Sequence, residues 1–148
     1  MPILFRTLAI TGSAMFAGTM LAIGVILGGY WRSLPPAEFL DWFAQNSQLV
    51  ARAIPMSVIA TAIGLAGAVW SDWATETPRN IWLAAAACVL IALVITAVYF
   101  VQSNTAFAAK AIPIDQVPAK LDTWQMIHNL RIALAVAASA LGVWAISR

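Results

Sequence analysis

The sequence predicts an all-α integral membrane protein: a bundle of four transmembrane helices, with one interfacial helix between the first and second spans. Three observations support this fold class. Hydrophobic residues make up 62% of the 148 residues and charged residues only 9%, whereas soluble domains average about 25% charged residues. The few charges separate uncharged stretches of about 20 residues, the length of a membrane-crossing helix. Aromatic residues stand at the ends of these stretches, as membrane–water interfaces favour.

The same composition excludes several classes of function. Eight Lys and Arg against six Asp and Glu leave a net charge of +2, too small for the basic face that a nucleic-acid binder needs. We therefore expect no nucleic-acid partner, no soluble enzyme and no disordered tail. We predict one integral membrane domain over residues 1–148, in a bacterial inner membrane, with the lipid bilayer as its first partner.

The uncharged stretches define four predicted spans. The first follows Arg6 and ends at an interfacial Tyr30–Trp31 pair. It is longer than the apolar core of a signal peptide, so we expect it to be retained. The predicted spans cover residues 8–30, 53–71, 81–102 and 124–147. An even number of spans places both termini on the same side of the membrane, but the loop charges are too evenly divided to give an orientation.

The fourth span differs from the others because it must carry polar residues into the membrane. Only 16 residues separate Arg131 from Arg148, which is about 24 Å of helix at roughly 1.5 Å per residue. The hydrocarbon layer is about 30 Å thick. The helix must therefore begin near Trp124 and take Arg131 with it.

The connections between the spans are unequal. Residues 33–52 begin with two prolines and place their apolar side chains roughly on one face, which predicts the interfacial helix. Pro55 predicts a kink where this helix leads into the second span. The link over residues 71–80 is short and polar. Residues 103–123 contain two prolines among charged residues, and we expect this stretch to be irregular and exposed to water.

Small residues recur at four-residue spacing, which lets helices approach closely in lipid. They form two stripes and one pair: Ala14–Gly18–Ala22, Ala60–Gly64–Ala68 and Gly24–Gly28. We expect them to pack helices inside the bundle. A dimer face, and with it a homo-oligomer, is the alternative.

The only histidine of the chain lies at the start of the fourth span, in TWQMIHNLR. Trp124, His128 and Arg131 are spaced i, i+4 and i+7, so they share one face of a helix. The connection 33–52 and the end of the third span meet on the same membrane face, which predicts a pocket beside His128 with Arg131 turned into it. Ionisable groups inside a membrane are costly and are candidates for function.

A structural interpretation of the same three residues stays open. Arg131 would extend to the interface or cap a loop carbonyl, Trp124 would belong to an aromatic belt, and His128 would be a hydrogen-bonded core residue. One His and the single cysteine, Cys88, on different helices do not make a metal site. We predict no metal and no cofactor, with a haem held by His128 alone as a remote alternative.

Three pieces of sequence point to a family. The first is a glycine-bearing span followed by a Pro turn and a Phe-containing helix, AGTMLAIGVILGGYWRSLPPAEFLDWFAQNSQLV. The second is Asn104, after the third span, and the third is the motif W-x-x-x-H-x-x-R at Trp124, His128 and Arg131. In this layout the whole chain resembles the anthrone oxygenase-like family of small four-span membrane proteins. Members usually carry Pro two residues before the Asn, where this chain has Gln102.

The resemblance implies a cofactor-independent monooxygenase that oxidises an activated C–H of a lipophilic, anthrone- or quinone-like molecule with molecular oxygen. His128 would act as the general base, and Arg131 would stabilise the resulting enolate or phenolate. Two tryptophans would stack on the substrate rings, Trp124 and Trp42, and two asparagines would hydrogen-bond its oxygens, Asn104 and Asn46. The alternative is a non-catalytic membrane protein, either an accessory subunit of a larger complex or a binder of a small ligand.

Overall fold

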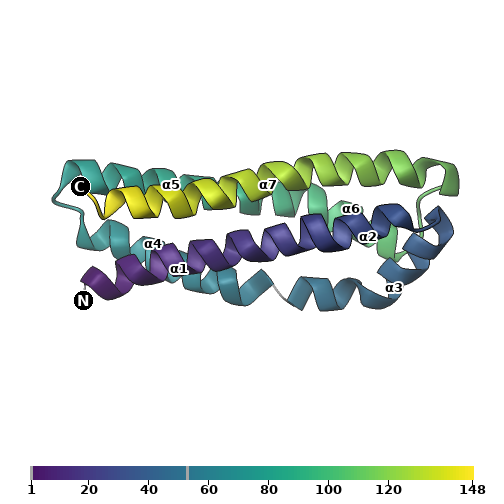
Figure 1. The fold of residues 1–148 in the computed structure, drawn as a ribbon, viewed down its shortest axis with the longest axis horizontal. Coiled ribbons are helices and arrows are strands. Elements are labelled where there is room, and N and C mark those ends of the chain that lie inside the picture. The colour runs from purple at the N-terminus through teal and green to yellow at the C-terminus, as the bar shows by residue number, and fades with distance from the viewer. Residues whose placement is uncertain (1, 53) are drawn as a thin grey trace.

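In the computed structural model, which describes residues 2–52 and 54–148, the chain forms an all-α bundle whose long helical runs lie side by side (Figure 1). Two π-helical segments interrupt the α-helices: η1 joins α1 to α2, and η2 joins α5 to α6. A 3₁₀ turn, η3, directly precedes α7. In chain order the elements are α1 (Pro2–Leu21), η1 (Ala22–Leu27), α2 (Gly28–Ser33), α3 (Pro36–Arg52), α4 (Ile54–Ser71), α5 (Glu76–Ile95), η2 (Thr96–Phe100), α6 (Val101–Ala108), η3 (Ile114–Gln116) and α7 (Val117–Ala145).

Four helical runs are long and apolar enough to cross a membrane: Pro2–Ser33, Pro36–Ser71, Glu76–Ala108 and Ile114–Ala145. Large apolar side chains such as Met56, Trp70 and Leu90 are exposed on the outside of the bundle, as suits a surface in contact with lipid. The chain is a multi-pass integral membrane protein. Its N- and C-termini lie at the same end of the bundle (Figure 1).

Close packing of α1 on α4 depends on one of the predicted small-residue stripes. A Cβ placed on Gly64 would overlap the backbone of Ala9, and Ala68 is fully buried. The Ala14–Gly18–Ala22 stripe was expected to pack in the same way, and this prediction is wrong. Gly18 has no neighbour within 4 Å of an added Cβ, because α1 turns a different face, with Phe16 and Met20, into the core.

The stretch 103–123 is mostly helical, so the prediction of an irregular connection is wrong for most of its length. α6 continues the third run to Ala108, and α7 begins at Val117. Pro118 lies in the first turn of α7, where a missing N–H removes no helical hydrogen bond. Lys110, with φ of 52°, turns the chain out of α6.

The helix expected between the first two spans is present as α3, which packs against α6 beside the end of the first run. Its place at the membrane surface stays a prediction. Pro55 is the second residue of α4, a position that tolerates proline. The residue between α3 and α4, on which part of the predicted kink falls, lies outside the described residues.

A hydrogen-bonded cluster fixes the end of the bundle where the termini lie. Asp72 is buried and accepts hydrogen bonds from the Arg6 guanidinium and, at 2.8 Å, from Trp82 Nε1. These contacts join α1 and α5 to the short turn after α4, and so tie three of the four helical runs together.

We expect Gly64→Leu to destabilise the bundle strongly, because the new side chain would meet the backbone of α1 rather than a movable side chain. Overpacking of this kind costs about 1–3 kcal/mol or more. Thermal unfolding in detergent, followed by circular dichroism, measures the change. Gly18→Leu is the matched control and should leave the midpoint nearly unchanged, because it points into open space. Equal midpoints for the two variants would contradict this description of the α1–α4 interface.

Candidate functional site

The residues of the W-x-x-x-H-x-x-R motif lie together on the inner face of α7. Trp124, His128 and Arg131 expose only 3%, 1% and 3% of their surface. This burial contradicts two parts of the structural interpretation: the extension of Arg131 to the interface and the place of Trp124 in an outer aromatic belt. Its third part, a hydrogen-bonded His128 in the core, agrees with the structure. The motif instead faces Met20 on the first helical run and Phe100 on the third.

His128 is held by one hydrogen bond and two ring contacts. Its Nε2 lies 2.8 Å from the backbone oxygen of Met20. Its ring stacks on Trp124 at 4.8 Å and 12°, and Phe100 meets it edge-on at 5.9 Å. Because a carbonyl oxygen can only accept, Nε2 carries the proton and donates it. Nδ1 is buried without a hydrogen-bond partner among the described residues, so in the neutral ring it offers a free lone pair.

Arg131 is a buried cation whose contacts are all uncharged. One terminal nitrogen lies 3.1 Å from Met20 Sδ, and Cζ lies 4.1 Å from the centre of the Phe100 ring. None of the ion pairs formed by residues 2–52 and 54–148 includes Arg131, and its Nε has no partner there. A thioether is a weak acceptor, and a ring face compensates a charge only in part. The site therefore holds positive charge that an anion would stabilise.

Two glycines of the first helical run make room for the polar side chains of α7. A Cβ on Gly24 would lie 2.8 Å from His128 Cδ2 and 2.9 Å from Ile132 Cδ1. A Cβ on Gly28 would overlap the side-chain amide of Gln125. The predicted Gly24–Gly28 pair thus packs inside the bundle, against the site. Gly24 lies in η1, and π-helical segments of this kind occur frequently at functional sites.

Asn104 is joined to the motif by a direct hydrogen bond. Trp124 Nε1 donates to Asn104 Oδ1 at 2.9 Å. This contact fixes the plane of the indole ring, and with it the ring of His128 stacked on the indole. Asn104 takes this position although the residue two places earlier is Gln102 rather than the Pro usual in the family that the sequence resembles.

An open groove of about 600 Å³ runs beside the motif, between the α3–α4 junction, η2–α6 and the start of α7. Its lining includes four aromatic residues, Trp31, Phe43, Phe100 and Trp124, and its polar groups include Asn104 and Arg52. His128 and Arg131 do not line it. A pocket is present where the polar connections meet, but the expectation that it lies against His128 with Arg131 turned into it is wrong. Trp124 and Phe100 form the wall, and the Arg131 guanidinium is held by Met20 and Phe100 behind it.

Two residues expected to bind substrate lie outside this arrangement. Trp42 packs against Trp31 with 5.5 Å between ring centres and does not line the groove. Asn46 donates its side-chain N–H to the Trp42 carbonyl, 2.9 Å away on its own helix. The structure does not bring them to His128 and Arg131, and their role in substrate binding stays a prediction.

Sequence reasoning missed Met20 and Phe100, which contact both His128 and Arg131. Helical spacing offered a weak indication of each. Met20 lies four residues before Gly24, and Phe100 lies four residues before Asn104, so each shares a face with a residue that the pattern already singled out.

A family model described as anthrone oxygenase matches residues 3–141 of the chain. The search of curated proteins and the search of solved structures returned no match.

We expect Gly24→Ala to displace His128 and to weaken its hydrogen bond to Met20, because the added methyl group would lie 2.8 Å from the imidazole. His128 is the only histidine, so ¹⁵N-histidine labelling gives one pair of ring-nitrogen resonances. The unmodified protein at neutral pH should show the Nε2–H tautomer, and Gly24→Ala should shift both resonances. Gly29→Ala, which meets nothing within 4 Å, is the control. Identical spectra for Gly24→Ala and Gly29→Ala would contradict this arrangement.

Proposed function

The chain belongs to the anthrone oxygenase family, and on this premise we propose that it is a membrane oxygenase for a lipophilic, anthrone- or quinone-like fused-ring substrate. The observation that carries the proposal is the buried Arg131, a cation without a carboxylate partner among the described residues. It lies one helical turn from His128, whose buried Nδ1 has no hydrogen-bond partner in the part of the chain that the structure describes. A base and a fixed cation in this arrangement suit a reaction that passes through an organic anion.

The reaction divides naturally between these two side chains. Nδ1 of His128 removes a proton from an activated methylene group, and the electron pair spreads onto the rings and oxygens of the substrate. Arg131 stabilises the enolate or phenolate that forms. Molecular oxygen then oxidises this anion: one oxygen atom becomes the new carbonyl oxygen, and the other leaves as water with the two hydrogens of the methylene group. The substrate supplies all the electrons, so the balance needs no further reductant.

The groove supplies the route to the buried pair. Its volume of about 600 Å³ lies within the roughly 300–1,000 Å³ typical of small-molecule sites. Aromatic walls suit a flat fused-ring molecule that reaches the groove from the bilayer. Phe100 separates the groove from Arg131, and its ring lies against the guanidinium. Displacement of Phe100 by the substrate would place an aromatic anion where Phe100 now provides a neutral ring.

The remaining parts of the proposal concern setting and partners. We place the protein in a bacterial inner membrane with both termini on one side, and a homo-oligomer stays a prediction. We also propose that the reaction needs no bound cofactor or metal. An absorption spectrum of the purified protein tests the cofactor part, since haem or flavin would absorb visible light.

We expect His128→Gln and Arg131→Leu each to lower oxygen consumption with an anthrone by at least about 10²-fold, since each removes a group needed in the anionic step. Arg131→Leu should not lower the unfolding temperature, because leucine replaces an unpaired buried charge. An oxygen electrode and thermal unfolding in lipid nanodiscs provide the two measurements.

Arg148→Leu is the matched control, because its guanidinium lies over Trp144 at the far end of α7 and should not affect the rate. If Arg131→Leu prevents folding while Arg148→Leu does not, Arg131 has a structural role and the proposal loses its main support.

Phe100→Ala should open the groove to the buried pair. We expect kcat/KM for a four-ring substrate to rise by about tenfold relative to a three-ring one, a typical gain from a changed apolar wall. Phe107→Ala is the matched control, because Phe107 is equally buried and packs on Phe39 and Phe43 but does not itself line the groove. If the two variants shift substrate preference equally, Phe100 does not separate substrate from Arg131.

A ligand-binding protein is the second candidate, favoured by the fact that His128 and Arg131 are packed behind the groove wall. It predicts that an anthrone quenches the fluorescence of Trp31 and Trp124 at the groove without oxygen consumption. Quenching in the unmodified protein with no turnover would replace the oxygenase proposal with this one.

A further inference from the structure

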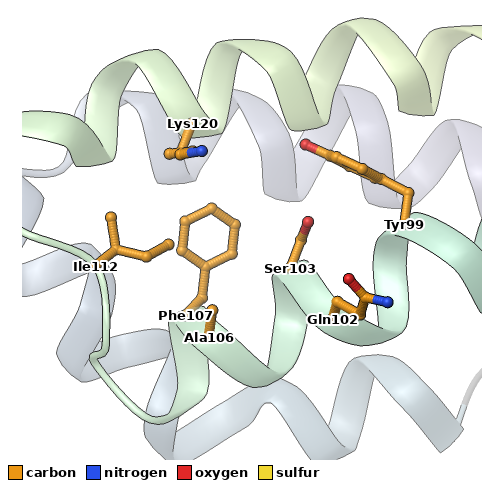
Figure 2. A pocket seen from close by; sticks show the side chains of 7 residues that line it. All are labelled: Tyr99, Gln102, Ser103, Ala106, Phe107, Ile112 and Lys120. Carbon is orange, nitrogen blue, oxygen red and sulfur yellow. The ribbon is translucent and has the colours of Figure 1, made fainter.

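A second cavity lies on the other flank of η2–α6, facing the start of α7. It has a volume of about 230 Å³ and is separate from the groove beside the motif. Its polar lining consists of Tyr99, Gln102, Ser103 and Lys120, and its apolar lining includes Phe107 and Ile112. In Figure 2 the Tyr99 and Ser103 hydroxyl groups project from one wall toward the helix that carries Lys120 on the opposite side.

The charge of Lys120 is not matched by a carboxylate within the described chain. The neighbouring cations at this end of the bundle are matched: Lys110 pairs with Asp41, and Arg32 pairs with Asp122 at 2.8 Å. Lys120 appears in none of the ion pairs formed by residues 2–52 and 54–148. Its ammonium group is therefore available to a ligand in the cavity.

The hydroxyl groups that line the cavity are also available. Thr96, Thr105 and Thr123, on the same helices, each donate to the carbonyl four residues earlier, the usual arrangement of a hydroxyl on a helix. Ser103 makes no such bond within the described residues, and Tyr99 donates to no group there. An ammonium and two hydroxyl groups thus converge on one cavity that offers them no anionic acceptor.

The position of the cavity indicates which molecule could supply an anionic group to accept these hydrogen bonds. It lies beside the turn between α6 and α7, at the end of the bundle that carries the exposed charged pairs of Lys110 and Arg32. This is where lipid headgroups meet a membrane protein, and basic pockets between transmembrane helices bind their phosphates. The apolar wall formed by Phe107 and Ile112 can cover the first carbons of an acyl chain.

We propose that the cavity between η2–α6 and α7 binds a phosphate anion carried by an anionic phospholipid headgroup, with Lys120, Tyr99 and Ser103 as its ligands. Lys120 supplies the charge, and the two hydroxyl groups donate hydrogen bonds to phosphate oxygens. A cavity of about 230 Å³ holds the phosphate and its nearest carbons, while the rest of the lipid lies along the outside of the bundle. This site does not depend on the proposed oxygenase activity.

Native mass spectrometry of the full chain in a non-ionic detergent tests the site, with phosphatidylglycerol and phosphatidylcholine as the added lipids. Both lipids contain a phosphodiester, but the choline group cancels the charge of the second. We expect phosphatidylglycerol to bind more tightly, and Lys120→Gln to weaken its binding by about five- to tenfold. Tyr99→Phe should weaken it less, because it removes one hydrogen bond and no charge.

Lys110→Gln is the matched control: it removes an equal charge from the same end of the bundle, at a residue that already has the partner Asp41. Equal losses for Lys110→Gln and Lys120→Gln, or equal binding of the two lipids, would overturn the site. Inorganic phosphate distinguishes the two sources of the anion. Failure of millimolar phosphate to displace the lipid supports a headgroup site, and full displacement would show that the cavity takes free phosphate instead.

Discussion

The interior of a bilayer offers no water, so each polar group carried into it must find a partner within the bundle. In this chain the constraint falls on α7, which carries His128 and Arg131. Met20 provides a partner for both side chains: its carbonyl oxygen accepts a hydrogen bond from His128, and its thioether contacts Arg131. That arrangement requires the first helical run to lie very close to α7, and Gly24, with no side chain, makes the approach feasible.

The same packing leaves two groups unsatisfied, and these give the site its chemical character. His128 Nδ1 has no partner and Arg131 has no counter-ion among the described residues. Unpaired buried charge is costly, and a bundle selected for stability alone would place an apolar residue there. An enzyme that must stabilise an organic anion has a reason to keep both groups. Phe100 and Trp124 separate them from the groove, and in the proposed reaction a flat substrate displaces the ring of Phe100.

η2–α6 gives the third helical run two functional flanks. One side carries Phe100 and Asn104 toward the groove and the motif, and the other carries Tyr99 and Ser103 toward the second cavity. The edge-on contact of Tyr99 with Phe100, at 5.1 Å, is the place where the two flanks meet. One short segment thus borders both the proposed substrate route and the proposed headgroup site.

The printed sequence is enough to predict the four membrane-spanning helices, the entry of Arg131 into the fourth, and the alignment of Trp124, His128 and Arg131 on one face. Hydropathy, charge spacing and helical period are local properties of the chain, so they can be determined without knowledge of the fold. The sequence does not reveal that Met20 and Phe100 complete the site, that Gly18 faces outward while Gly24 faces His128, or that Arg131 lies behind the groove wall. These depend on how each helix is rotated about its axis, and in lipid that rotation is set by side-chain packing between helices rather than by the hydrophobic pattern.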